Sequence, residues 1–163
     1  MTYEVCSFTG HRQIKAAHRK AIDDLVLRAI GFAYSKGCRI FMTGGAIGFD
    51  TVAARAVIMF RLSHPDVRLC CVLPCKNQDE RWSDRQRDNY EYTISQANEV
   101  IYVSDEYTKD CMRRRNSVLA ERADILISYV SRNESGAAQT VRMAERLGKE
   151  IYNLYPTLEN GKA

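Results

Sequence analysis

Two kinds of segment alternate along the chain. Short runs that are apolar at nearly every position predict strands buried on both faces, and they cover residues 3–9, 39–42, 67–73, 99–103, 124–130 and 150–154. The longer segments between them are predicted helices, most clearly residues 14–35, where apolar residues recur every three or four positions. The other predicted helices cover residues 49–62, 84–97, 112–123 and 137–147.

This alternation is typical of parallel strands joined by helical crossovers. It continues through the whole chain without a linker or an internal repeat. We therefore predict one doubly wound α/β domain of the Rossmann type over residues 1–163, with a mainly parallel sheet, helices on both faces and a loose tail over residues 155–163. A length of 163 residues is ordinary for a single domain.

The overall composition narrows the class of protein. Hydrophobic residues make up 45% and charged residues 27%, which is typical of a soluble globular domain. The net charge of +4 is only mildly basic, whereas a duplex-DNA binder usually has a stronger, clustered excess, so nucleic acid is not favoured as a partner. No apolar run is long enough to span a membrane, and no signal peptide is expected at residues 1–4. A cytoplasmic protein without membrane contact is expected.

The six cysteines do not suggest a metal site. Cys6, Cys38, Cys70 and Cys71 lie within the predicted strands and are expected to be buried thiols. The chain has no pair of cysteines with the spacing of a zinc site, so no metal and no cofactor is expected. Cys75, which follows a strand end, is a weak candidate for a reactive thiol.

The segment TGGAIGFD, residues 43–50, lies between a predicted strand and a predicted helix. Ligands of such sheets bind beyond the carboxyl ends of the strands. A glycine turn that enters a helix can direct several N–H groups at a phosphate. Asp50, near the helix start, could accept hydrogen bonds from ribose hydroxyls or cap the helix. The alternative is a tight turn without a ligand.

Two other loops are expected at the same edge of the sheet. Gly10, His11 and Arg12 follow the first strand, and Arg12 could bind a phosphate through two N–H groups or simply form polar surface. Ser135 and Gly136 open another helix, whose N-terminus could point into the same crevice or be an ordinary helix start.

Five stretches together resemble a known family. They are SFTGHR (residues 7–12), TGGAIGFDTVAA (43–54), LPCKNQDERW (73–82), YTKDCMRRRN (107–116) and SGAAQTVRMA (135–144). In this order, and over nearly the whole chain, they are similar to the SLOG superfamily, which includes the lonely-guy phosphoribohydrolases and the DNA-processing protein A family. The greatest similarity is to its YpsA-like branch.

The resemblance implies a binding site for a nucleotide or a nucleotide-derived ligand at the strand ends. With the loops above, it gives one set of candidate ligand-binding residues: Thr9, Gly10, His11, Arg12, Gly44, Gly45, Gly48, Asp50, Gln78, Trp82, Arg115, Asn116, Ser135, Gly136 and Thr140.

Several of these candidates have competing interpretations. Trp82, the single tryptophan, could stack on a base or pin its own loop to the domain. Because a helix turns about 100° per residue, the three arginines of residues 113–115 cannot face one ligand, and the motif favours Arg115 with Asn116 in the crevice. Relatives have Gly-Gly-Thr where this chain has Ser-Gly-Ala at 135–137, and Thr140 could replace the missing hydroxyl.

The acids near the second glycine turn bear on catalysis. The phosphoribohydrolases carry a glutamate just after this turn, where a carboxylate can assist glycosidic cleavage. Residues 137–140 contain no acid, and the nearest ones are Glu134 and Glu145. This favours a binding or sensing module. The first alternative is a nucleotide N-glycosidase or phosphohydrolase that uses Asp50, and the second is a single-stranded nucleic-acid binder. Relatives often associate, so a homodimer is expected.

Overall fold

A computed structural model describes residues 3–131 and 135–161. Its strands are β1 (Val5–Gly10), β2 (Ile40–Thr43), β3 (Arg68–Leu73), β4 (Glu99–Tyr102), β5 (Ile125–Tyr129) and β6 (Glu150–Asn153). Its helices are the short 3₁₀ helix η1 (Ala16–His18), α1 (Arg19–Ser35), α2 (Phe49–Ser63), α3 (Asp84–Gln96), α4 (Cys111–Arg122), α5 (Gly136–Arg146) and α6 (Tyr155–Glu159). Every predicted strand and helix has its counterpart.

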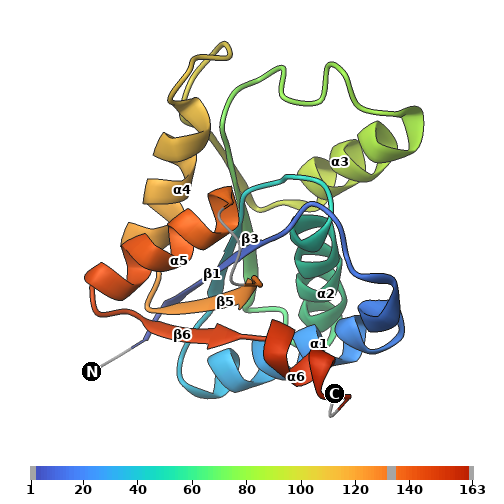
Figure 1. Ribbon diagram of the computed structural model, residues 1–163, viewed down its shortest axis with the longest axis vertical. Coiled ribbons are helices and arrows are strands. Elements are labelled where there is room, and N and C mark those ends of the chain that lie inside the picture. The colour runs from blue at the N-terminus through green and yellow to red at the C-terminus, as the bar shows by residue number, and fades with distance from the viewer. Residues whose placement is uncertain (1–2, 132–134, 162–163) are drawn as a thin grey trace.

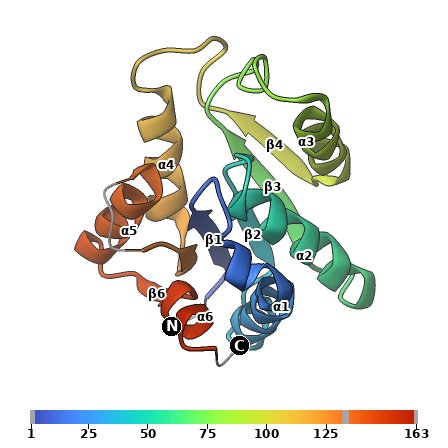
Figure 2. The ribbon, with the colours of Figure 1, turned by 45° about the vertical axis from the view of Figure 1, so that its right-hand side comes forward.

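The six strands form one parallel sheet in the order β4-β3-β2-β1-β5-β6, and Figure 1 shows this sheet between two layers of helices. In the centre, Cys6 of β1 is level with Phe41 of β2 and with Ile125 of β5. Helices α1, α2 and α3 cover one face, and α4 and α5 cover the other (Figure 2). The predicted doubly wound α/β fold is confirmed.

The strands are apolar because both of their faces are buried. On one face, Phe8, Phe41 and Ile127 belong to the large core beneath α1 and α2, whereas Met42 and Val72 pack against α4 on the other. All six cysteines are free thiols in buried positions. This confirms the prediction for Cys6, Cys38, Cys70 and Cys71, and Cys75 and Cys111, for which no burial was predicted, are buried too.

The order in which the chain adds strands to the sheet reverses between β1 and β5. The chain runs outward from β1 to β4 on one side and then returns to add β5 and β6 on the other. Helix α1, which follows β1, and helix α5, which follows β5, lie on opposite faces (Figure 2). A crevice opens at such a switch point, beyond the carboxyl ends of the strands.

The C-terminal segment corrects the expectation of a loose tail. Residues 155–159 form α6, and its Leu158 is buried in the large core. Glu159 Oε1 accepts hydrogen bonds from Nε2 of the buried His18, at 2.7 Å, and from Nζ of Lys15, at 2.6 Å. These partners lie far away in the sequence, so the local pattern around residue 155 could not reveal them.

If α6 is part of the domain, Leu158→Ala should lower the free energy of unfolding by about 2 kcal/mol or more, because it removes a buried side chain. Asn160→Ala, an exposed change at the end of the same helix, is the matched control and should change it by less than about 0.5 kcal/mol. Urea unfolding curves measure both. Equal stability of the two variants would mean that the tail is loose after all.

No helix in the described part of the chain combines the length and the apolar character that crossing a membrane requires.

Candidate functional site

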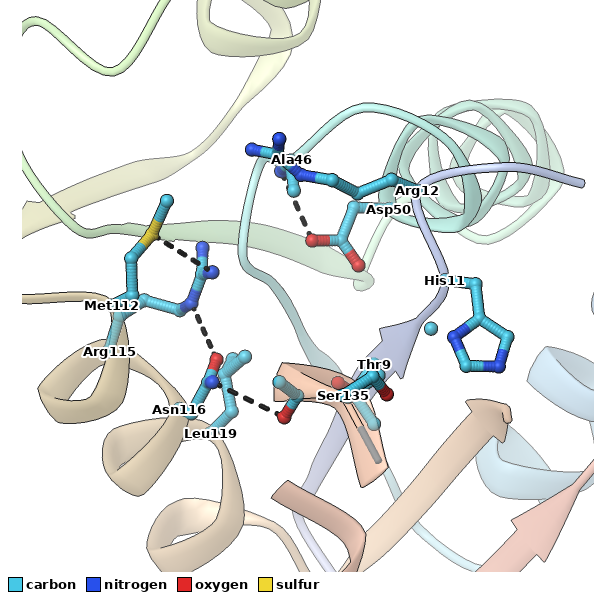
Figure 3. A pocket seen from close by; sticks show the side chains of 13 residues that line it. Thr9, His11, Arg12, Ala46, Asp50, Met112, Arg115, Asn116, Leu119 and Ser135 are labelled. Atoms are coloured by element: carbon cyan, nitrogen blue, oxygen red, sulfur yellow. Dashed lines mark hydrogen bonds between the residues drawn. The ribbon is translucent and has the colours of Figure 1, made fainter. Parts of the chain in front are cut away.

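A cavity of about 320 Å³ lies at the switch point (Figure 3). Its wall combines the end of β1, the start of α2, one face of α4 and the start of α5. Among the predicted site residues, the structure brings together Thr9, Gly10, His11, Arg12, Asp50, Arg115, Asn116, Ser135 and Gly136. Residues from four separate segments therefore meet as the family motifs suggested.

Four further residues of the wall escaped the sequence analysis: Ala46, Met112, Leu119 and Ala137. Met112 and Leu119 lie on α4 within three or four residues of Arg115. Helical periodicity around the Arg-Asn pair could therefore have identified them. They give one side of the cavity an apolar surface.

Arg115 and Asn116 tie three elements together. Arg115, only 6% exposed, donates from Nη1 to the carbonyl of Gly44 and from Nε to Oδ1 of Asn116, the latter at 2.8 Å. Nδ2 of Asn116 donates in turn to the carbonyl of Gly136 at 3.4 Å. The pair thus connects α4 with the start of α5 and with residues 44–48, the glycine loop between β2 and α2. Figure 3 shows the hydrogen bond between Arg115 and Asn116 as a dashed line.

The neighbouring arginines behave as the helical rotation predicts. Arg113 and Arg114 are exposed, and Nη2 of Arg114 donates to the carbonyl of Val103 at 2.8 Å. Of the three described arginines 113–115, Arg115 alone lines the cavity.

The glycine loop contacts protein groups closely, which differs from the open phosphate cradle that the sequence suggested. A side chain at Gly44 would meet the guanidinium of Arg115, and one at Gly48 would meet the backbone of residues 11–12. The N–H of Phe49 donates to the carbonyl of His11 at 3.0 Å. Gly44, Gly45 and Gly48 therefore lie behind the cavity wall, and they shape it by letting other segments approach.

Asp50 is placed in the wall by the first turn of α2. The residue is 6% exposed, and Oδ2 accepts the N–H of Ala46 at 3.1 Å. Burial raises the pKa of Asp50 to about 6, against the opposing effects of Arg115, the Ala46 N–H and Arg12. Asp50 does not cap α2, because Gly48 occupies the N-cap position.

His11 is held by Ser131, which follows β5. Nε2 accepts the backbone N–H of Ser131 at 2.9 Å, so the neutral ring carries its proton on Nδ1. Burial lowers the pKa of His11. The ring lies edge-on to Tyr129 and Tyr155, with centroids 6.0 and 6.3 Å away.

Gln78 and Trp82 do not line the cavity. Trp82 lines a smaller gap of about 10 Å³ between the glycine loop and α3. Nε2 of Gln78 donates to the carbonyl of Gly45 at 3.3 Å. Trp82 packs edge-to-face on Tyr90 with centroids 5.1 Å apart. These contacts fit the interpretation in which Trp82 pins its loop.

The start of α5 reaches the cavity through Ser135 and Gly136. Oγ of Ser135 accepts the N–H of Ala138 at 3.1 Å and so caps the helix. Thr140 is buried and donates to the carbonyl of Gly136 at 3.0 Å. Its hydroxyl is used inside the helix, so Thr140 does not replace the threonine of the relatives.

Among the described residues, no group of three or more His, Cys, Asp or Glu side chains could hold a metal ion. Burial raises the pKa of the Cys75 thiol, which disfavours the reactive thiolate. Glu134 lies outside the described residues.

Comparisons with solved structures show that the fold is shared with DNA processing protein A. The Helicobacter pylori protein, described for its single-stranded DNA binding mode, superposes with a TM-score of 0.66 and 17% identity, over 99% of this chain and 74% of its own. The Streptococcus pneumoniae protein gives a TM-score of 0.65 and 16% identity over 93% of this chain. This chain covers only 50% of that protein, and the likeness at such identities concerns the fold.

Sequence comparisons identify uncharacterised bacterial relatives. The SPbeta prophage-derived protein YoqJ of Bacillus subtilis is 26% identical over 130 residues, which cover 71% of this chain and 76% of YoqJ. A UPF0398 protein of Bacillus cereus is 25% identical over 143 residues, which cover 86% of this chain and 73% of the relative. A sequence model of the YspA SLOG family matches residues 3–156. The chain therefore belongs to the YspA SLOG family.

Proposed function

We propose that this chain binds a nucleotide or a nucleotide-derived ligand through its phosphate, in the cavity at the switch point. The observation that carries the proposal is the convergence of two guanidinium groups and one helix start on a single cavity. Arg12 comes from the β1 loop, Arg115 from α4 and Gly136 from the start of α5. Phosphates favour such surroundings, because arginine forks and helix N-termini both supply N–H donors and positive potential.

The size of the cavity supports a small ligand. About 320 Å³ lies at the lower end of the range of roughly 300–1,000 Å³ that is usual for small-molecule sites. Met112 and Leu119 offer an apolar side to a base or sugar, and the arginines offer the polar side. This division suits a ligand with one anionic and one less polar part.

Binding without catalysis remains the favoured form of the proposal. Residues 137–140 carry no acid, so the glutamate of the phosphoribohydrolases has no equivalent after the second glycine turn. An enzyme would have to use Asp50, whose pKa of about 6 would suit general acid–base catalysis. Incubation with nucleoside monophosphates tests this alternative, because release of free base by the wild-type protein, stopped by Asp50→Asn, would establish an enzyme.

Single-stranded nucleic acid is the second candidate ligand. The Helicobacter pylori neighbour binds single-stranded DNA, which weakens the expectation that nucleic acid is an unlikely partner. Arg113 and Arg114 are exposed beside the cavity and could contact successive phosphates. Affinity for a single-stranded oligonucleotide that falls steeply with salt would support this function. The expected homodimer stays a prediction, which sedimentation of the purified chain would test.

Arg12→Ala should weaken the binding of adenosine monophosphate, or of the tightest ligand in a panel of nucleoside mono- and diphosphates, by about tenfold to a hundredfold. A charge-assisted hydrogen bond contributes about 1.5–3 kcal/mol, and every 1.4 kcal/mol is about a tenfold change. Arg12 is exposed, so the fold should be retained. Titration calorimetry measures the effect.

Arg113→Ala is the matched control, because it removes the same charge from an exposed position outside the cavity. It should change the affinity less than twofold. An equal loss in both variants would instead indicate a general basic surface and favour the nucleic-acid candidate.

A further inference from the structure

A buried carboxylate faces the cavity with one oxygen unpaired. Oδ2 of Asp50 accepts the N–H of Ala46, but Oδ1 has no hydrogen-bond partner among the described residues. Arg12 and Arg115 flank it (Figure 3), and within the described part of the chain neither forms an ion pair with it. A buried charge without a partner is costly, so Asp50 lacks either a proton or a bound group.

Apart from His11, the titratable groups packed around Asp50 keep one protonation state near neutral pH. Cys71 of β3 and Tyr90 of α3 line the small gap next to it, and burial raises the pKa of both, so both stay protonated. Arg12 and Arg115 stay charged because guanidinium does not lose its proton in proteins. His11 is the other titratable group of the cavity wall.

Ionised Asp50 reduces the positive charge of the cavity at the place where an anion would enter. Each arginine carries a charge of +1 and ionised Asp50 a charge of −1. The three side chains together therefore have a net charge of about +1 when Asp50 is ionised and about +2 when it is protonated. The higher positive charge favours an anion.

We propose that the cavity takes up a proton together with its anionic ligand, and that Asp50 holds this proton. The inference rests on the proposed phosphate site and adds its regulation by pH. Because coupling is reciprocal, a bound anion favours the protonated carboxyl, and protonation favours the anion. The affinity for an anion therefore rises as the pH falls through the pKa of Asp50, and it levels off below.

Inorganic sulfate is the probe that isolates this effect, because its own charge does not change between about pH 5 and 8, unlike that of a phosphate. If only the protonated protein binds, the competent fraction falls from about nine-tenths at pH 5 to a few hundredths at pH 7.5, for the pKa of about 6. The wild-type protein should then bind sulfate about thirtyfold more tightly at pH 5 than at pH 7.5.

Two variants assign the effect. Asp50→Asn should bind sulfate with nearly the same affinity at both pH values, and at pH 7.5 more tightly than the wild type. His11→Gln retains an acceptor for the N–H of Ser131 and should keep the wild-type pH dependence. A flat wild-type profile, a profile unchanged in Asp50→Asn, or one lost in His11→Gln would overturn the inference. Tighter binding at pH 7.5 would also overturn it, since it would mean that ionised Asp50 accepts a bond from the ligand.

Calorimetry in two buffers of different ionisation enthalpy gives a second readout that does not depend on the folding of a variant. The wild-type protein should take up close to one proton per bound sulfate at pH 7.5. Binding without proton uptake would refute the coupling and leave the phosphate site standing, whereas no sulfate binding at any pH would refute the anion site and the coupling together.

Discussion

Gly48→Ala is expected to lower the free energy of unfolding by about 3 kcal/mol or more. Gly48 has a φ of +85° and a ψ of −124°, a combination that residues with a side chain rarely adopt, so a side chain here costs about 1–3 kcal/mol in backbone strain. A Cβ would also meet the carbonyl oxygens of Arg12 and His11, the second at 2.6 Å. Backbone atoms cannot rotate away, so the loop must shift, at a cost of roughly 1–3 kcal/mol or more.

Gly148→Ala is a control for a positive φ without a steric clash. Gly148 has a similar φ of +72°, but a Cβ there would meet nothing within 4 Å. This control should cost only the backbone part, about 1–2 kcal/mol. Chemical denaturation of both variants measures the difference. Equal losses would show that the contact between the glycine loop and residues 11–12 does not matter for stability.

The regular elements were predictable because their signal is local. The strands are short apolar runs, and the helices are the longer segments between them. Most of these elements therefore begin and end within a few residues of their predicted bounds. Helix α6 is different, because five residues carry little periodicity and its stability comes from His18, Lys15 and the core. Contacts of this range are invisible to a local pattern.

The candidate site was partly predictable for a similar reason. The orientation of Arg115 and Asn116 follows from the helical rotation, and the meeting of the loops follows from parallel strands. What fills the space beside each glycine depends on distant segments. Gly44 makes room for the side chain of Arg115, and Gly48 makes room for the backbone of residues 11–12. Glycines whose pattern suggests a phosphate-binding loop can therefore serve the close packing of the protein's own segments.

The placement of Thr140 illustrates the same limit. Its spacing from Ala137 suggested a substitute hydroxyl for the ligand, but a threonine inside a helix can donate to the carbonyl four residues earlier. Thr140 does this to Gly136. Spacing along the chain shows which residues are neighbours on the helix. It does not show that the hydroxyl of Thr140 already donates to a backbone carbonyl.

Arg115→Ala is expected to reduce both stability and ligand binding, because Arg115 holds the cavity together as well as facing it. The change leaves the carbonyl of Gly44 and Oδ1 of Asn116 without their donor. Each buried polar group that loses its partner costs about 1–3 kcal/mol, and the vacated volume adds to this. The free energy of unfolding should therefore fall by about 3–5 kcal/mol.

Arg113→Ala is the control for this change as well, because it removes an exposed arginine from the same helix and should change stability by less than about 0.5 kcal/mol. Arg115→Lys keeps the charge but not the planar fork, so it should lie between the two. Urea unfolding gives the stabilities, and titrations at a temperature where all variants are folded give the affinities.

If Arg115→Ala is as stable as Arg113→Ala, the hydrogen bonds between the glycine loop, α4 and α5 are not what positions the cavity wall. If it is unstable but Arg115→Lys binds the ligand as the wild type does, the site needs the positive charge of this residue rather than its two-pronged geometry.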